Sequence, residues 1–282
     1  MPELAEVRIM SEFINDIADK ELFFERIEKS PVSKVKTDLD VFDGGVFTVT
    51  AQSRGKEMMV VLEKVGGNVD GSEFMKLKVT LGMSGNWIYL RAGIPEEEQI
   101  LKHCHLRFVS TRGNYLALYD VRRFAKWSWT DNWDKKRGPC PLTEHSEFRK
   151  RIKETLYSHK LKDAPLNELL MNQSFFNGIG NYLRAEILHR LDVNPFQKFS
   201  ELSEGNVNIL LDLCKKCCKE AYILGGGQLK DWSNPTGLDG KSFDLWRQCY
   251  GKGMSINDRT GRRFWYNPKW EEFVPVEYKE SE

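Results

Sequence analysis

The sequence lacks any apolar run approaching the roughly 18 residues that cross a bilayer, which excludes a transmembrane helix and a membrane partner. It also lacks the basic-then-apolar start of a signal peptide, since its first six residues are acidic and mixed. Neither charge is in excess, because 42 Lys and Arg against 41 Asp and Glu give +1. A globally basic nucleic-acid binder is therefore not indicated, although a local basic face remains compatible with this balance.

Cysteine is sparse, with six residues and no secretory signal, so we expect free thiols in a reducing, intracellular setting and not a disulfide framework. Cys214 and Cys217 have the spacing of half a zinc site. They lie in an apolar-periodic stretch, 207–224, that predicts a helix, and no second such pair follows. A structural zinc normally needs four ligands, so we predict no metal and no cofactor.

The 282 residues are 40% hydrophobic and 29% charged, which is typical of a folded chain long enough for two domains. A helical stripe covers 4–20, and short β-rich runs then alternate with turn residues. A Pro-broken connector near 135–141 precedes helical patterns, and the last thirty or so residues predict a hairpin and tail. Strands are predicted at 46–51, 58–62, 77–81, 87–90, 106–109, 115–119 and 126–129, and later helices at 148–157, 166–171, 182–190, 203–224 and 243–250.

The segment 173–186 joins two of the predicted helices through Gly178 and Gly180, which permit a tight reversal. Asn181 then opens a helix whose first backbone amides have no partner within the helix. Such amides, at the positive end of the helix dipole, form a phosphate site. An ordinary helix–turn–helix hairpin with a Gly-rich turn is the alternative interpretation.

Several turns carry side chains that gain meaning only in combination. Lys56 follows Gly55 between two strands, Met83 lies in a Gly-flanked turn, and Arg122 and Phe124 follow another strand. Taken singly, they are a turn lysine, core residues and a surface arginine. Together they supply a phosphate-binding lysine and an apolar wedge with an arginine, which is the equipment that extrudes a base from a duplex.

The first residues supply a candidate reaction. Pro2 follows the initiator methionine, and a small residue there favours removal of Met1. Removal exposes a secondary α-amine, and α-amino groups have a pKa of about 7.7–8.0 in reference peptides. Such an amine can attack a sugar C1′ to give an iminium, and Glu3 can move protons beside it. The alternative is that Met-Pro-Glu is an arbitrary beginning.

In combination these residues resemble the formamidopyrimidine-DNA glycosylase/endonuclease VIII family, and most closely its vertebrate-type endonuclease VIII-like branch with a zincless finger. The matching segments occur in family order along nearly the whole chain: 2–4 with 6–7, 54–56, 82–85, 103–105, 120–124, 177–186 and 261–265, with 188–191 and 247–251 typical of the branch.

The resemblance implies an α+β fold with a helix-flanked β-sandwich (1–133), a linker (134–145), a helix–two-turn–helix domain (146–246) and a zincless finger with tail (247–282). It implies a bifunctional DNA glycosylase/AP lyase of base excision repair, acting as a monomer on damaged DNA bound in the cleft between the domains. Oxidised pyrimidines, formamidopyrimidines and hydantoins are the implied substrates, and a nuclear location is implied if the host is eukaryotic.

The same resemblance assigns individual roles. Pro2 matches the Schiff-base nucleophile and Glu3 the proton donor that opens the deoxyribose, while Lys56 matches a phosphate contact that assists β-elimination. The other matches are Arg262 at the finger tip with a role in δ-elimination, His103 and Asn181 as backbone-phosphate contacts, and Met83, Arg122 and Phe124 as the void-filling triad, with Arg122 facing the estranged base.

The chain departs from the family pattern in a few places. Ala5 replaces a proline-containing pattern, which affects only the chain path. Of the finger's zinc-binding cysteines only Cys249 lies near an expected position, so aromatic packing around 264–266 must hold the hairpin. In the loop 224–230 that resembles the lesion-recognition loop, Gly227 and Gln228 stand where the branch carries a lysine, which leaves lesion preference open. The acidic end, 277–282, differs from the basic tail of vertebrate relatives and does not support partner recruitment through it.

Two other functions remain open at this point. A catalytically silent damaged-DNA binder would bind DNA through the same residues and catalyse no reaction. Retention of Met1 would produce that state, because the nitrogen of Pro2 would then be part of a peptide bond. An RNA-binding helical module would leave Pro2, Glu3 and Arg122 unexplained.

Overall fold

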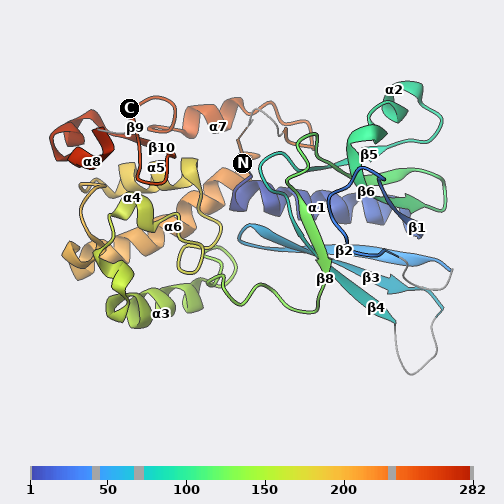
Figure 1. Ribbon diagram of the computed structural model, residues 1–282, viewed down its shortest axis with the longest axis horizontal. Helices are drawn as coiled ribbons and strands as arrows, with labels where there is room; N and C mark the ends of the chain where they lie inside the picture. The colour runs from blue at the N-terminus through green and yellow to red at the C-terminus, as the bar shows by residue number, and fades with distance from the viewer. Residues whose placement is uncertain (1, 40–44, 67–72, 228–232, 280–282) are drawn as a thin grey trace. The chain divides into compact units, whose positions relative to one another are not determined.

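The computed structural model describes residues 2–39, 45–66, 73–227 and 233–279 (Figure 1). It divides the chain into two units: a β unit of Met1–Pro2, Glu6–Trp133 and Gly227–Asp239, and a helical unit of Glu3–Ala5, Asp134–Gly226 and Gly240–Glu282. Strands fill the first unit and helices dominate the second. The expected α+β fold, with an N-terminal β part and a C-terminal helical part, is therefore confirmed.

The β unit is built on one antiparallel sheet of eight strands in the order β5-β7-β6-β1-β2-β3-β4-β8. Buried and more exposed residues alternate along 47–54, 74–80 and 126–129, as half-buried strands require, whereas 57–64, 104–110 and 115–119 are buried over most of their length. The strands are β1 (Phe24–Lys29), β2 (Phe47–Arg54), β3 (Glu57–Lys64), β4 (Phe74–Thr80), β5 (Asn86–Leu90), β6 (Cys104–Ser110), β7 (Tyr115–Tyr119) and β8 (Lys126–Trp129).

Aromatic side chains fill the junction between the two halves of this sheet. Among the described residues, β1 pairs with β2 only at Phe24 and Phe47, whose rings stack at 6.1 Å. Phe108 packs edge-on against both rings and lies parallel to Trp87 at 5.7 Å. All four side chains are fully or almost fully buried, so they form an aromatic core at this junction.

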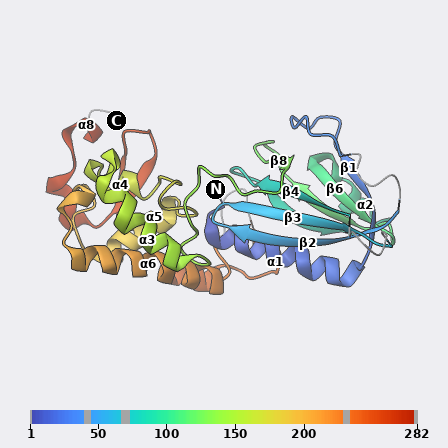
Figure 2. The same ribbon diagram turned by 90° about the horizontal axis from the view of Figure 1, so that it is seen from below.

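Helix α1 (Leu4–Glu21) confirms the predicted N-terminal helix and packs against the sheet (Figure 2). Its Asn15 side chain donates to the carbonyl oxygen of Ala51 and accepts from the amide of the same residue, at 3.1 and 2.7 Å. This pair of bonds satisfies a backbone position on β2 and fixes the register of the helix against that strand. Two short elements, α2 (Pro95–Glu98) and η1 (Leu101–His103), lie in the β5–β6 connection.

The helical unit has one buried core to which nearly all of its helices contribute. Its elements are α3 (His145–Thr155), η2 (Leu156–Ser158), η3 (Lys160–Asp163), α4 (Leu166–Leu169), α5 (Asn181–Leu191), η4 (Phe199–Glu201), α6 (Glu204–Ile223), α7 (Lys241–Trp246), β9 (Met254–Asn257), β10 (Arg263–Tyr266), η5 (Pro268–Phe273) and α8 (Val276–Lys279).

Helix α7 ends earlier than the sequence pattern predicts, at Trp246 and not at Tyr250. The buried carboxylate of Glu186 accepts the backbone amides of Gln248, Cys249 and Tyr250 at 2.8–2.9 Å. These amides therefore bond to a side chain of α5 and cannot continue a helix.

The hairpin β9–β10 is held by rings, as the missing zinc ligands led us to expect. Phe264 and Tyr266 stack at 6.0 Å, and Phe196 packs edge-on against both. Among the described residues no group of three or more His, Cys, Asp or Glu is arranged to hold a metal ion.

All six cysteines are buried free thiols, and burial raises the pKa of Cys217 and Cys249 to about 12. In the same described part of the chain, no helix has the length and apolar character to cross a membrane.

Candidate active site

Asp120 joins the two turns that carry the predicted wedge. Its Oδ1 accepts from the Ser84 hydroxyl at 2.5 Å, and its Oδ2 accepts from the Ala125 amide at 2.7 Å. Gly82 has a φ of +62°, and a Cβ there would lie 2.6 Å from the backbone carbon and oxygen of Phe124. Only glycine fits this contact, so the two turns are packed together and tied by one buried carboxylate.

Met83, Arg122 and Phe124 consequently belong to one local assembly, as the sequence analysis predicted. The guanidinium carbon of Arg122 lies 4.8 Å from the centre of the Phe124 ring, within the range of a cation–π contact. Phe124 is 41% exposed and Met83 is partly buried. An exposed aromatic ring beside an arginine on a fixed turn has the form of a wedge that can enter a base stack.

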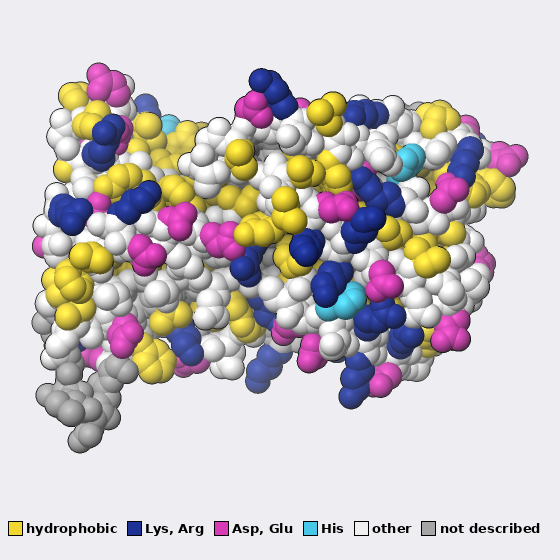
Figure 3. All heavy atoms as spheres, turned by 180° about the vertical axis from the view of Figure 1, so that it is seen from behind, with side chains coloured by type: hydrophobic (Ala, Val, Ile, Leu, Met, Phe, Trp, Pro, Cys, Tyr) yellow, Lys and Arg dark blue, Asp and Glu magenta, His cyan; other side chains and the backbone are white. Residues whose placement is uncertain are grey.

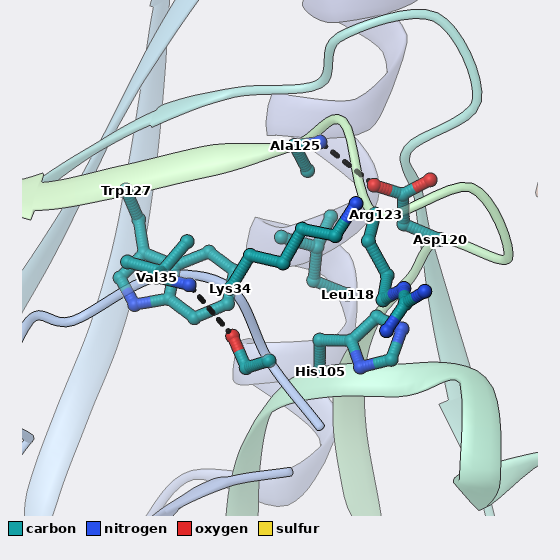
Figure 4. A pocket seen from close by; sticks show the side chains of 9 residues that line it. Lys34, Val35, His105, Leu118, Asp120, Arg123, Ala125 and Trp127 are labelled. Carbon is teal, nitrogen blue, oxygen red and sulfur yellow. Dashed lines mark hydrogen bonds between the residues drawn. The ribbon is translucent and has the colours of Figure 1, made fainter. Parts of the chain in front are cut away.

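A small pocket lies beside the same turn (Figure 4). Lys34, His105, Asp120, Arg123 and Trp127 contribute side chains to its wall. Neither ring nitrogen of buried His105, nor the indole nitrogen of Trp127, has a hydrogen-bond partner among the described residues. Burial lowers the pKa of His105, and the positive charges of Arg123 and His103 act in the same direction.

The two remaining predicted contacts of the β unit lie at turns. Lys56 follows Gly55, which has a φ of +58°, in the turn between β2 and β3, and is partly buried. His103 ends η1 and meets Tyr119 edge-on at 5.9 Å, while its carbonyl oxygen accepts from the amide of Asp120 at 2.9 Å. Asp120 therefore also connects His103 to the wedge turns.

Glu3 occupies the N-terminus of helix α5. Its Oε2 accepts from the amides of Gly180 and Leu183 at 2.8 and 3.2 Å, and its Oε1 from that of Tyr182 at 2.9 Å. The side chain is only 3% exposed. The prediction that these amides form a phosphate site was wrong, because a carboxylate of the chain itself fills the position where the helix dipole favours negative charge.

The reversal before α5 follows the expected glycine pattern. Gly178 has a φ of +97°, and its carbonyl oxygen accepts from the amide of Leu4 at 3.0 Å. Gln173 spans the turn, because its side chain accepts from the amide of Gly178 and donates to the carbonyl of Ile179. The two-turn segment is therefore closed by side chains and by the start of the chain.

Asn181 and Arg262 are the predicted phosphate contacts of the helical unit. Both form hydrogen bonds with a buried ion pair of Arg184 and Asp258, which was not predicted. Arg184 donates through Nε to the side-chain oxygen of Asn181 at 3.0 Å, and through Nη1 to Asp258 at 2.7 Å. The other oxygen of Asp258 accepts from the amide of Arg262 at 3.1 Å. Arg184 lies inside a segment that the resemblance singled out, whereas no sequence signal marks Asp258.

Pro2 is buried and lies directly before Glu3, while Met1 is outside the described residues. The segment compared with the lesion-recognition loop is described only up to Gly227, whose amide donates to buried Glu6 at 2.8 Å. Its remaining positions, 228–230, lie outside the described residues.

Basic side chains are unevenly distributed over the helical unit. Figure 3 shows Lys and Arg gathered on the face of this unit that α3 and α6 form. Arg149 and His145 of α3 contact Asp212 of α6 there, at 2.5 and 3.7 Å. A net charge of +1 is thus compatible with a locally basic surface.

Comparison with known proteins is consistent with this arrangement. The model of the formamidopyrimidine-DNA glycosylase N-terminal domain matches residues 1–127. Endonuclease 8-like 1 of Homo sapiens is 36% identical over 94% of this chain and 72% of its own length. Formamidopyrimidine-DNA glycosylase of Actinobacillus succinogenes is 28% identical over 89% of this chain and 88% of its own length.

Solved structures share the fold. A Lactococcus lactis Fpg mutant in complex with Fapy-dG-containing DNA has a TM-score of 0.73 at 22% identity, covering 95% of this chain and 99% of its own. MutM (Fpg) of Thermus thermophilus has a TM-score of 0.70 at 22% identity, covering 95% of this chain and 98% of its own.

We predict that Asp120→Asn loosens the wedge turns. The amide nitrogen of asparagine cannot accept a hydrogen bond, so either Ser84 or Ala125 loses its partner. A lost buried partner costs about 1–3 kcal/mol in the free energy of unfolding, which urea unfolding measures. Exposed Asp131→Asn is the matched control and should change little. Equal stability of the two variants would contradict the role of Asp120.

The buried His105 predicts a pH dependence of stability. Because its pKa is lowered in the folded state, the unfolded chain binds the additional proton first as the pH falls below about 6.5. Stability then decreases with falling pH, by at most about 1.4 kcal/mol per pH unit for this one group. His105→Gln should reduce the difference between urea midpoints at pH 7.5 and 5.5. An unchanged difference in His105→Gln would refute the assignment.

Proposed function

The chain belongs to the formamidopyrimidine-DNA glycosylase/endonuclease VIII family of DNA glycosylases, and from this premise we propose that it is a bifunctional glycosylase/AP lyase of base excision repair. It excises an oxidised base and then cleaves the strand by β,δ-elimination. Pro2, Glu3, Lys56 and Arg262 are its proposed catalytic residues, and damaged DNA is its partner.

The proposed reaction begins with the amine of Pro2 after Met1 has been removed. The nitrogen bonds to C1′ of the deoxyribose, and the base leaves with the electron pair of the glycosidic bond and takes up a proton. The proline nitrogen passes its proton to Glu3, which returns it to O4′ as the C1′–O4′ bond breaks, and this ring opening gives an iminium. The iminium makes the C2′ proton acidic, so loss of that proton expels the 3′ phosphate with the electron pair of the C3′–O bond. A second elimination, with loss of the C4′ proton, expels the 5′ phosphate with the electron pair of the C5′–O bond. Glu3 supplies the proton that opens the sugar ring.

The observation that carries the proposal is the position of Glu3. Its carboxylate is fixed by three backbone amides at the first turn of α5, the helix whose first residue is Asn181. Pro2, the proposed nucleophile, is joined by one peptide bond to Glu3, the proposed proton donor. Because Glu3 is bonded to the first turn of α5, both residues are tied to the helix that begins at Asn181, the proposed phosphate contact. Rigid placement of reacting groups is a main source of rate enhancement.

The remaining proposed roles concern DNA binding. We propose that Lys56 and Arg262 contact phosphates during the two eliminations, and that His103 and Asn181 contact the backbone. Met83, Arg122 and Phe124 are proposed to fill the void left by the extruded base, with Arg122 facing the estranged base. The cation–π contact between Arg122 and Phe124, and the shared support of both turns by Asp120, favour this assignment.

We further propose oxidised pyrimidines, formamidopyrimidines and hydantoins as substrates, a monomeric state, a nuclear location in a eukaryotic host, and activity without a metal or other cofactor. The division into a catalytic part (1–133), linker (134–145), helix–two-turn–helix part (146–246) and finger with tail (247–282) belongs to the same proposal. The alternative function is a silent damaged-DNA binder, which the tests below separate from the enzyme.

Borohydride trapping tests the nucleophile. Protein whose intact mass shows loss of Met1 should form a covalent adduct with DNA that contains an abasic site, because borohydride reduces the iminium. The same chain with Met1 retained, or with a blocked amine, should bind this DNA without forming the adduct.

Equal trapping with Met1 retained would overturn the role of Pro2. Binding without trapping by the processed chain would instead identify a silent binder. Undamaged duplex serves as the control for non-specific reduction.

Glu3→Gln tests the proton donor, but it also turns an amide group toward backbone donors. Base excision should fall about 10²–10⁴-fold, the usual scale for a positioned acid or base. Cleavage at a preformed abasic site should fall less, because the base is already gone. Single-turnover rates on folded protein provide the measurement.

The matched control is Glu186→Gln, since Glu186 is equally buried and also accepts three backbone amides. It should lose comparable thermal stability and retain excision. A similar loss of excision in both variants would show that Glu3 acts only through folding.

A further inference from the structure

Arg184 is the most deeply buried basic side chain among the described residues, with no exposed surface. It donates hydrogen bonds to four different residues of the helical unit. Its partners are the side chains of Asn181 (3.0 Å) and Asp258 (2.7 Å) and the carbonyl oxygens of Asn167 (3.0 Å) and Arg263 (3.3 Å). One guanidinium thus connects α4, the start of α5 and both sides of the finger hairpin.

The ring of Phe264 closes the remaining side of this guanidinium, with its centre 4.9 Å from the guanidinium carbon. Phe264 is itself fully buried and packs edge-on against Phe196. The planar group therefore has hydrogen-bond partners around its edge and an aromatic face beside it. A lysine at this position could not reproduce that geometry, because its ammonium group is a point charge without a rigid fork.

Asp258 shapes the tip of the hairpin with its second carboxylate oxygen. Oδ1 accepts from the amide and hydroxyl of Thr260 at 2.9 and 2.6 Å, and from the amide of Arg262 at 3.1 Å. The backbone of Asp258 also pairs with that of Arg262 and accepts from the amide of Gly261, which has a φ of +72°. Burial alone would raise the pKa of Asp258, but the bonds from Thr260 and Arg184 outweigh burial and lower it.

We infer that Arg184 and Asp258 are positioning residues that set the placement of Arg262 relative to Asn181. This inference rests on the proposed function, in which those two residues contact DNA phosphates. The chain of bonds is short: Asn181 side chain, Arg184 guanidinium, Asp258 carboxylate, Arg262 amide. In a finger without metal ligands, the buried ion pair supplies a rigid link between the hairpin tip and the start of α5.

A buried pair of this kind contributes more to geometry than to net stability. Burying two charges has a desolvation cost that commonly cancels their attraction, and apolar replacements are often equally stable. Removing only one partner strands a charge in the interior, so Arg184→Met alone is expected to fold poorly. The variant Arg184→Met/Asp258→Asn removes both charges of this pair together, and its asparagine oxygen can still accept from the turn.

The experiment measures how much Arg262 contributes to DNA binding in different backgrounds. In the wild-type chain, Arg262→Ala should weaken binding to duplex with an abasic-site analogue and lower the salt slope of log Kd by about one unit. In the Arg184→Met/Asp258→Asn background, Arg262→Ala should change the affinity less than about twofold and leave the salt slope unaltered, because the arginine is no longer placed. The ratio of δ- to β-elimination products should fall in this background as it does in Arg262→Ala.

The matched control removes a second ion pair that also reaches the hairpin tip. Arg259 forms a bidentate contact with Glu168 at 2.6–2.8 Å, and Arg259 is about half exposed. Arg259→Met/Glu168→Gln should leave the Arg262 effect on the salt slope intact. Circular dichroism and thermal unfolding of every variant confirm that folded protein is compared.

An undiminished Arg262 effect in the Arg184→Met/Asp258→Asn background would overturn the positioning role while leaving the proposed function in place. A wild-type chain with no salt-dependent binding to damaged DNA would overturn the proposed function, and the positioning role with it. Loss of the Arg262 effect in the Arg259 control as well would show general loosening of the finger and would also refute a specific role for Arg184 and Asp258.

Discussion

The first backbone amides of α5 have no acceptor within the helix, and Glu3 supplies that acceptor. The placement of the N-terminal segment depends on this interaction. Three amides converge on one carboxylate that lies near the beginning of the chain. Because the adjoining amide of Leu4 also bonds to Gly178, the N-terminal segment and the two-turn reversal become one piece of structure. The position of Pro2 then follows from the position of a helix terminus.

The same solution recurs at Glu186, where three amides after α7 are gathered by a carboxylate from α5. Arg190 completes this arrangement by pairing with Glu186 at 2.5 Å and lying over the ring of Trp246. The irregular backbone after α7 is thus satisfied by charged side chains of α5. Charge-assisted bonds of this kind are short and directional, so they can fix a loop without a metal or a disulfide.

Local patterns in the sequence were sufficient to predict most of the fold. The helical stripe of α1 and the short β-rich runs identified seven of the eight strands, because burial of one face leaves a periodic signature. Strand β1 was not predicted, since its six residues, Phe24–Lys29, are mostly charged and only Phe24 is fully buried. Its place in the sheet comes from pairing with β6, which no local pattern reveals.

The site was predictable where a motif carried it and not where distant partners complete it. Asp120 and Ser84 are 36 positions apart, Arg184 and Asp258 are 74 apart, and Glu3 and Gly180 are 177 apart. The interpretation of the α5 amides as a phosphate site failed for this reason, because the competing carboxylate lies far away in sequence. A helix terminus indicates that an anion is needed there, but not whether the anion comes from a ligand or from the chain.

Three of the buried carboxylates in the described part of the chain each fix a segment that carries a residue of the proposed site. Asp120 fixes the turns of Met83 and Phe124, and Asp258 fixes the tip that presents Arg262. The carboxylate of Glu3 anchors the backbone directly after Pro2. The net charge of the chain is close to zero. Its buried carboxylates bond to backbone groups and in this way fix the positions of a few other side chains. Since affinity for a polyanion grows with the number of phosphates that are neutralised, a chain with little net charge must depend on the placement of these groups.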